Sequence, residues 1–220
     1  NFNTADGTFT YTPPAALQPL DDGESTDITF TYRANDGSLD SNTATVTITV
    51  NGANDAAVAV DDAAATSEDA TVTIDVLDND SDVDGDSLSI TNLTQPASGS
   101  VSLVGGQIVF DPGSDFQSLG AGESQQVTFT YTANDGTEDS NTATVTITVN
   151  GANDAAVAVD DSAATSEDAT VSIDVLDNDS DVEGDGLTIT NLTQPASGSV
   201  SIVGGQIVFD PGSDFQSLAA

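Results

Sequence analysis

The sequence repeats itself with a period of 99 residues. Val50–Ala56 reads Val-Asn-Gly-Ala-Asn-Asp-Ala and returns unchanged as Val149–Ala155, while Phe30–Tyr32 returns as Phe129–Tyr131. A period of this length means that one structural unit is copied along the chain. Whatever fold one unit adopts, the other copies therefore adopt as well.

Units that begin at the Asn-Asp linker divide the chain into three parts. Residues 1–55 are then the back part of one unit, residues 56–154 a complete unit, and residues 155–220 the front part of a third. The complete unit contains seven candidate strands separated by Gly, Pro, Asn and Asp turns. They are residues 58–60, 72–77, 88–93, 100–104, 107–110, 126–131 and 143–149.

Apolar residues and threonine alternate along these segments with a period of two, as in strands buried on one face only. Helical periodicity is missing. Seven short strands in 99 residues predict an all-β fold, in which antiparallel immunoglobulin-like sandwiches are arranged in tandem. The predicted core consists of Ile74, Val76, Ile90, Val101, Phe110, Val127, Phe129, Tyr131, Val145, Ile147 and Val149.

The charge of the chain is almost entirely negative. There are 37 acidic residues, one basic residue (Arg33), no His and no Cys, so the formal net charge is -36. Binding to nucleic acid or to an anionic membrane surface needs cationic side chains, and we expect neither partner. The alternation of apolar residues argues against disorder, and no apolar run approaches the roughly 18 residues that a membrane-spanning helix needs.

An Asp-rich segment interrupts the apolar pattern of the complete unit. Asp80, Asp82 and Asp84 alternate, and Gly85 allows a sharp turn that brings alternate carboxylates together. Carboxylates held close together repel one another unless they are solvated or share a cation. Oxygen ligands in this pattern predict Ca²⁺ as cofactor. The candidate ligands are Asp78, Asp80, Asp82, Asp84 and Asp86, and in the next copy Asp177, Asp179, Asp181, Glu183 and Asp185.

This segment is not an EF-hand loop. If Asp80 is position 1, position 12 is Thr91, where an EF-hand has a bidentate Glu. A solvated acidic turn without metal is the alternative interpretation.

The repeat resembles a known family. The segments 34–37 (Ala-Asn-Asp-Gly) and 41–50, followed by Asn54-Asp55, resemble the closing strand and linker of a cadherin domain. With the Asp-rich segment and residues 60–69, the whole period is similar to the bacterial cadherin-like repeats of VCBS-type, Bap-type and RTX-type surface adhesins. The resemblance implies calcium-stabilised sandwiches strung along very long secreted proteins.

The resemblance also implies further calcium ligands. Asp36 and Asp135 match the acidic residue of the cadherin Ala-x-Asp motif. The other implied ligands are Asn54, Asp55, Asn153 and Asp154 of the linkers, together with Asp62, Glu68, Asp161 and Glu167. Gly52 and Ala56 stand where the animal linker has oxygen ligands, so we expect fewer ions at each junction than in animal cadherins.

Function follows from what the composition excludes and from the repetition. Without His, Cys or Lys there is no triad, thiolate, Schiff base or P-loop. Paired carboxylates could hydrolyse glycosides, but enzymes rarely repeat an active site in a string. We therefore predict a non-catalytic extender on a bacterial cell surface, in which calcium fixes neighbouring repeats of the same chain.

Two alternatives remain at this point. The chain could be a subunit of a self-assembling filament or surface layer, in which another copy completes the terminal units by strand complementation. It could also be a calcium-dependent glycan-binding module, although it has no Trp to form a platform for sugar.

Overall fold

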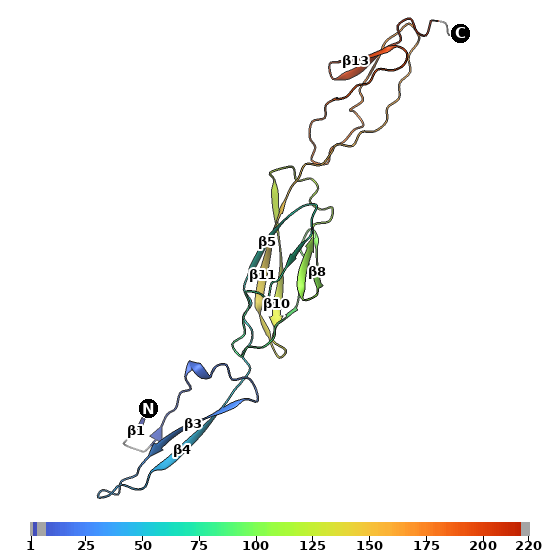
Figure 1. Ribbon diagram of the computed structural model, residues 1–220. Helices are drawn as coiled ribbons and strands as arrows, with labels where there is room; N and C mark the ends of the chain where they lie inside the picture. Colours follow the sequence, from blue (N-terminus) through green and yellow to red (C-terminus); the bar gives the residue numbers. More distant parts are fainter. Residues whose placement is uncertain (1, 4–7, 217–220) are drawn as a thin grey trace. The chain divides into compact units, whose positions relative to one another are not determined.

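The structure is a computed structural model that describes residues 2–3 and 8–216. Its regular elements are β-strands (Figure 1), apart from one short 3₁₀ helix, η1 (Ala15–Leu17). No helix among the described residues is long and apolar enough to cross a membrane.

The chain divides into two compact units. The first comprises Asn1–Ala64, Val72–Phe110 and Val127–Ile147, and the second comprises Ala65–Thr71, Asp111–Gln126 and Thr148–Ala220. Each Asn-Asp linker lies entirely within one of them. The surroundings of each linker are therefore defined within a single unit.

Residues 56–154 contain seven strands in two sheets. One sheet has the order β5-β11-β10-β7, formed by β5 (Asp62–Ser67), β11 (Asp139–Asn150), β10 (Ser124–Asn134) and β7 (Ser89–Thr91). The other has the order β6-β9-β8, formed by β6 (Val72–Ile74), β9 (Gln107–Asp111) and β8 (Ser100–Val104). Seven strands in two sheets confirm the predicted immunoglobulin-like architecture.

One predicted strand is wrong. Val58 forms only an isolated bridge with Ser81, and the strand lies further along the chain, as β5. Val58 and Val60 are exposed, whereas Ala57 and Ala59 are buried. The small alanines face the interior here. The pattern of larger apolar residues therefore predicted the wrong buried face and the wrong position for the strand.

The core consists of the inward-facing residues of the two long strands and their partners. Alternate residues of β11, from Ala143 to Val149, are buried, as are Val127, Phe129 and Tyr131 of β10. The predicted core is confirmed except at Ile90, which is half-buried. Ile108 and Phe116 are buried as well and were not predicted.

The copies on either side contribute smaller sheets. Before the first linker, β1 (Phe2–Asn3) pairs with β2 (Thr8–Phe9), and β3 (Ser25–Tyr32) pairs antiparallel with β4 (Ala44–Asn51). After the second linker, β12 (Val171–Ile173), β14 (Gln206–Asp210) and β13 (Ser199–Val203) form a sheet in the order β12-β14-β13. This order repeats β6-β9-β8 one period later.

Each linker is preceded by a glycine that packs closely against backbone. The Gly151 N–H donates to the Glu123 carbonyl at 3.0 Å, and a methyl group on Gly151 would overlap the carbonyl oxygens of Leu119 and Gly120. Only a residue without a side chain allows this approach. Gly52 occupies the same position at the first linker, where its N–H donates to the Glu24 carbonyl at 2.9 Å.

We expect Gly151→Ala to lower the free energy of unfolding by about 2 kcal/mol, because the added methyl forces neighbouring backbone apart. Gly186→Ala is the matched control, since nothing lies within 4 Å of a methyl at that position. Urea denaturation measures both. Equal stability of the two variants would contradict close packing at the linker.

Candidate metal centre

The first linker is held by a carboxylate from the Asp-rich turn. The Asp55 N–H donates to Asp84 Oδ2 at 2.7 Å. The other oxygen, Asp84 Oδ1, is buried and has no hydrogen-bond partner. A buried carboxylate oxygen without a donor is costly, so it is a natural ligand for a cation.

Asp82 shapes the turn itself. Its Oδ1 accepts hydrogen bonds from the backbone N–H groups of Asp84 at 2.9 Å, Gly85 at 3.0 Å and Asp86 at 3.2 Å. Gly85 has φ 86°, a conformation that suits glycine. Because Oδ1 satisfies three donors, the side chain is fixed, and Asp82 Oδ2 is left buried without a partner.

Asn54 and Asp135 form a second contact at the same linker. Asn54 Nδ2 donates to Asp135 Oδ2 at 3.1 Å, and Asn54 Oδ1 is buried without a partner. Asp135 Oδ1 accepts from the N–H groups of Thr137 at 2.6 Å and Glu138 at 2.7 Å. The Glu138 and Thr137 amides hold the pKa of Asp135 below its usual value, so this carboxylate stays charged.

The carboxylates around the first linker repel one another. Burial raises the pKa of Asp86, and the negative charges of Asp21, Asp82 and Asp135 raise it further. Arg33 is the only basic residue in the sequence, so side chains supply almost no compensating positive charge. A bound divalent cation would relieve this repulsion.

The second linker repeats the arrangement with a longer side chain. The Asp154 N–H donates to Glu183 Oε1 at 2.6 Å, and Glu183 Oε2 is buried without a partner. Asp181 Oδ1 accepts from the N–H groups of Glu183 at 3.2 Å and Asp185 at 3.0 Å. Glutamate therefore replaces Asp84 without loss of the contact to the linker.

Glu68 adds a carboxylate from the preceding copy to the second linker. Its side chain is 1% exposed, and its Oε1 accepts from the Ala152 N–H at 2.8 Å. The Glu68 N–H donates to the Asn150 carbonyl at 2.9 Å. Glu68 Oε2 is a further buried oxygen without a partner. A charged residue this deeply buried is rare unless something compensates its charge.

The donor set fits calcium, although the side chains do not form a finished cage. No group of three or more acidic side chains among the described residues is gathered closely enough to hold a metal ion as it stands. What both linkers provide is buried oxygen without a partner, from Asn54, Asp82 and Asp84 at one and from Glu68 and Glu183 at the other. Carboxylate and amide oxygens are the ligands that calcium prefers.

Asp80 and Asp62 lie in a different environment from Asp82 and Asp84. The Tyr131 hydroxyl lies 3.1 Å from both oxygens of Asp80, 3.2 Å from Asp62 Oδ2, 2.8 Å from the Val76 carbonyl and 3.3 Å from the Val60 carbonyl. Burial raises the pKa values of both Tyr131 and Asp62. A single phenol proton thus serves a group of acceptors inside the sandwich.

The other predicted ligands stand apart from these groups. Asp36 Oδ1 accepts from the N–H groups of Ser38 and Leu39, both at 2.8 Å, and these amides lower its pKa. Asp179 Oδ1 accepts from the Val159 N–H at 2.8 Å. The side chains of Asp78, Asp161, Asp177 and Asp185 are exposed. Assignment of all these residues to calcium remains a prediction.

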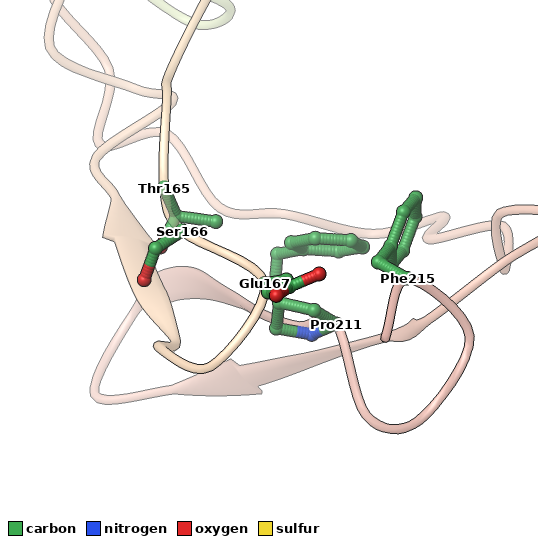
Figure 2. Close-up of a pocket in the computed structure, with 6 residues that line it drawn as sticks. Thr165, Ser166, Glu167, Pro211 and Phe215 are labelled. Carbon is green, nitrogen blue, oxygen red and sulfur yellow. The ribbon is translucent and has the colours of Figure 1, made fainter. Parts of the chain in front are cut away.

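A small cavity of about 150 Å³ lies in the copy after the second linker. It is lined by Thr165, Ser166, Glu167, Phe209, Pro211 and Phe215 (Figure 2). One period earlier, the corresponding Glu68 and Phe116 are buried, and Glu68 contacts Asn150 and Ala152. The cavity is therefore the place that a closing strand fills in the complete copy, and it is smaller than a typical ligand pocket of about 300 Å³ or more.

Sequence reasoning placed Tyr131 in the core and missed the role of its hydroxyl. The alternation along β10 correctly predicts that the ring is buried. The hydroxyl contacts Asp62 and Asp80, which lie 69 and 51 positions away in the sequence, and no local pattern predicts such contacts. The recurrence of the two aspartates as Asp161 and Asp179, and of the tyrosine as Tyr32, is the signal that the sequence offers.

The fold and the linker geometry define a protein of tandem immunoglobulin-like repeats. The model of the family described as bacterial Ig domain matches residues 2–49, 54–148 and 153–219. The chain therefore belongs to the bacterial Ig domain family. Domains of this family are typically non-enzymatic and are often exposed at surfaces.

Several solved structures are similar to the chain. A nucleoside hydrolase-related protein from Saccharophagus degradans is 22% identical over 44% of this chain and 26% of its own, with TM-score 0.30. An endo-fucoidan hydrolase of glycoside hydrolase family 107 is 16% identical over 87% and 30%, with TM-score 0.33. A protocadherin gammaB7 cis-dimer is 15% identical over 86% and 51%, with TM-score 0.40. The chain thus spans about half or less of these proteins, and no curated protein sequence matches it significantly.

We expect Tyr131→Phe to lower the free energy of unfolding by about 2 kcal/mol at neutral pH, because Asp62 and Asp80 lose a buried donor. Tyr32→Phe is the matched control: it is the same residue one period earlier, and its side chain is 51% exposed. Thermal and urea unfolding measure the difference. An equal effect at both positions would show that the buried hydroxyl contributes nothing.

The shifted pKa values predict how stability depends on pH in calcium-free buffer. Asp62 and Asp86 have pKa values above 3.8, so their contribution is complete below pH 3.8 and is lost as the pH rises through their folded pKa values. Asp135 has a lowered pKa, and hydrogen bonds from Asn134 and Thr91 lower the pKa of Asp139 as well. Their contribution is therefore complete above pH 3.8 and is lost as the pH falls below it. We therefore expect stability to rise as the pH falls from neutral toward 3.8, and to decline below that value.

Urea unfolding across this pH range measures the effect, and Asp62→Asn should flatten the rise. Asp111→Asn changes an exposed carboxyl and should leave the profile unchanged. A wild-type profile without a rise between neutral pH and 3.8 would contradict the assignment.

Proposed function

We propose that the chain is a calcium-stabilised spacer of an extracellular bacterial surface protein or adhesin. Membership of the bacterial Ig domain family indicates a non-catalytic, structural or adhesin-like role. One observation carries the calcium proposal. Both Asn-Asp linkers are bound by a carboxylate whose second oxygen is buried without a partner.

The residues that would hold calcium differ slightly between the linkers. At the first linker they are Asn54, Asp82 and Asp84, with Asp135 fixing the asparagine. At the second they are Glu183 of the following copy and Glu68 of the preceding copy. The ion would supply positive charge where these side chains have none. At the second linker it would join residues from both sides, Glu68 and Glu183.

Charge makes such an ion important for stability. A chain with a net charge of -36 is destabilised by repulsion among its own carboxylates, and this repulsion is greatest where carboxylates are buried together. Extracellular modules bind calcium with dissociation constants of about 0.1 to 1 mM. At tenfold excess, each ion would contribute roughly 1.4 kcal/mol to the free energy of unfolding.

Repetition supports the spacer role. Each copy adds length, and the linker keeps its hydrogen bond to the next acidic turn even where Glu183 replaces Asp84. A protein built in this way gains reach with each repeat and needs no new chemistry. Calcium at the linkers would restrict the motion of one copy against the next.

We expect millimolar calcium to raise the melting temperature of the full chain, because the ion binds the folded form alone. Asp84→Asn and Glu183→Gln each remove one charge while keeping the side-chain shape, and the double variant should weaken calcium binding at least about tenfold. Isothermal titration calorimetry measures binding, and small-angle scattering measures extension with and without chelator.

The control is Asp111→Asn combined with Asp75→Asn, which removes the same charge at exposed positions whose hydrogen bonds are to Gly113 and Gln107. This variant should bind calcium as the wild type does. If the two double variants weaken binding equally, the ions are held by the general negative charge and the linker proposal is wrong.

A further inference from the structure

The edge strand of one sheet contains no charged residue, although the chain as a whole is strongly acidic. Residues 87–110 contain no Asp, Glu, Lys or Arg, and residues 186–209 repeat this one period later. Strand β8 is the outer strand of the sheet β6-β9-β8, and β13 is the outer strand of β12-β14-β13. Natural outer strands are commonly protected by charged residues or proline, and neither is present within these two strands.

A glutamine side chain covers the beginning of this edge. The Val101 N–H donates to Gln95 Oε1 at 3.0 Å, and Gln95 Nε2 donates to the Val101 carbonyl at 2.9 Å. Gln194 makes the same pair of bonds with Val200, at 3.0 and 2.8 Å. The side-chain amide thus occupies the position that the peptide group of an additional strand would take.

The same geometry shows that the edge is open beyond the glutamine. Because the backbone groups of Val101 face Gln95 and not β9, alternation in an antiparallel ladder directs those of Leu103 outward as well. Leu103 is 50% exposed and Val104 58%, and their counterparts Ile202 and Val203 are 47% and 60% exposed. Each copy therefore presents an outward peptide group flanked by exposed apolar side chains.

We infer that β8 and β13 are the surface through which two copies of this chain associate side by side, each strand pairing antiparallel with its equivalent in the other copy. An antiparallel pair of identical strands is self-complementary, so the contact closes as a two-fold dimer. Gln95 and Gln194 limit the pairing to the part of the strand that follows Val101 and Val200.

Electrostatics favours a second copy at this edge. Two chains of net charge -36 repel each other wherever acidic surfaces meet, and residues 87–110 are a long uncharged stretch on which they can touch. Asp75, which follows β6, accepts a hydrogen bond from Gln107 Nε2 at 3.2 Å. Its charge does not lie on the edge strand, because β9 separates β6 from β8. Each single contact is short, and its recurrence at the 99-residue period gives the chain a second strand of the same kind.

Sedimentation velocity of the full chain in chelator tests this inference separately from calcium binding. We expect a dimer whose fraction increases with protein concentration and with salt, because salt screens the repulsion between copies. Leu103→Asp combined with Ile202→Asp should raise the dimer dissociation constant at least about tenfold, since like charges would face each other across the pair. Gln95→Ala combined with Gln194→Ala should lower it, because more of the edge becomes available.

Leu39→Asp combined with Thr128→Asp is the control that adds the same charge elsewhere. Leu39 is 74% exposed, and its counterpart one period later is the acidic residue Glu138, so the position accepts a carboxylate. This variant should dimerise as the wild type does. In the wild-type dimer, hydrogen exchange should slow at the Leu103 and Ile202 amides.

Three outcomes would overturn the inference. The wild type could stay monomeric at every concentration and salt level, or the Leu103 and Ile202 variant could dimerise as well as the control. Exchange protection at residues 161–166 and 188–190 in place of the edge would indicate end-to-end strand complementation between copies, which is a different assembly.

Discussion

The structure depends on acidic side chains whose two carboxylate oxygens lie in different environments. Asp82, Asp84 and Glu183 each use one oxygen to accept backbone N–H groups and keep the other buried without a partner. The first oxygen shapes a turn or holds a linker, and the second leaves negative charge inside the protein. With one Arg in the whole chain, that charge is met by peptide dipoles alone unless a cation binds. The calcium proposal rests on this imbalance.

The linker is consequently more than a connection between two sandwiches. Glu68 receives the Ala152 N–H, and Glu183 receives the Asp154 N–H, so groups from both sides of the second linker hold adjacent parts of it. Gly151 brings the backbone of the linker against the loop before β10, where a larger residue would not fit. Substitution of Glu183 for Asp84 is tolerated because either side chain places an oxygen on the linker amide. Repetition of these contacts is what makes the copied unit suitable for a spacer.

Charge and its absence are distributed unevenly over each copy. Carboxylates gather at the turns around the linkers, while residues 87–110 carry none. The first region requires compensation by a cation or by solvent, and the second allows another chain to approach. The side chains of Gln95 and Gln194 cover part of the edge strand, because their amides form hydrogen bonds with its backbone groups and introduce no charge. Contacts along the chain and contacts between chains thus use different surfaces of the same repeat.

The period, the all-β class and most of the core could be predicted from the sequence alone, because alternation and turn residues are local signals that a strand carries wherever it lies. It did not locate β5, since the inward-facing residues of that strand, Asp62, Ala64 and Thr66, are small or polar and only half-buried, so hydrophobic patterning does not mark them. The packing of the folded chain, and no local pattern, places Asp80 against Tyr131, Asp84 against the linker and Glu68 against Ala152. These contacts join residues 29 to 84 positions apart, and their geometry depends on how two sheets pack, which spacing along the chain does not encode.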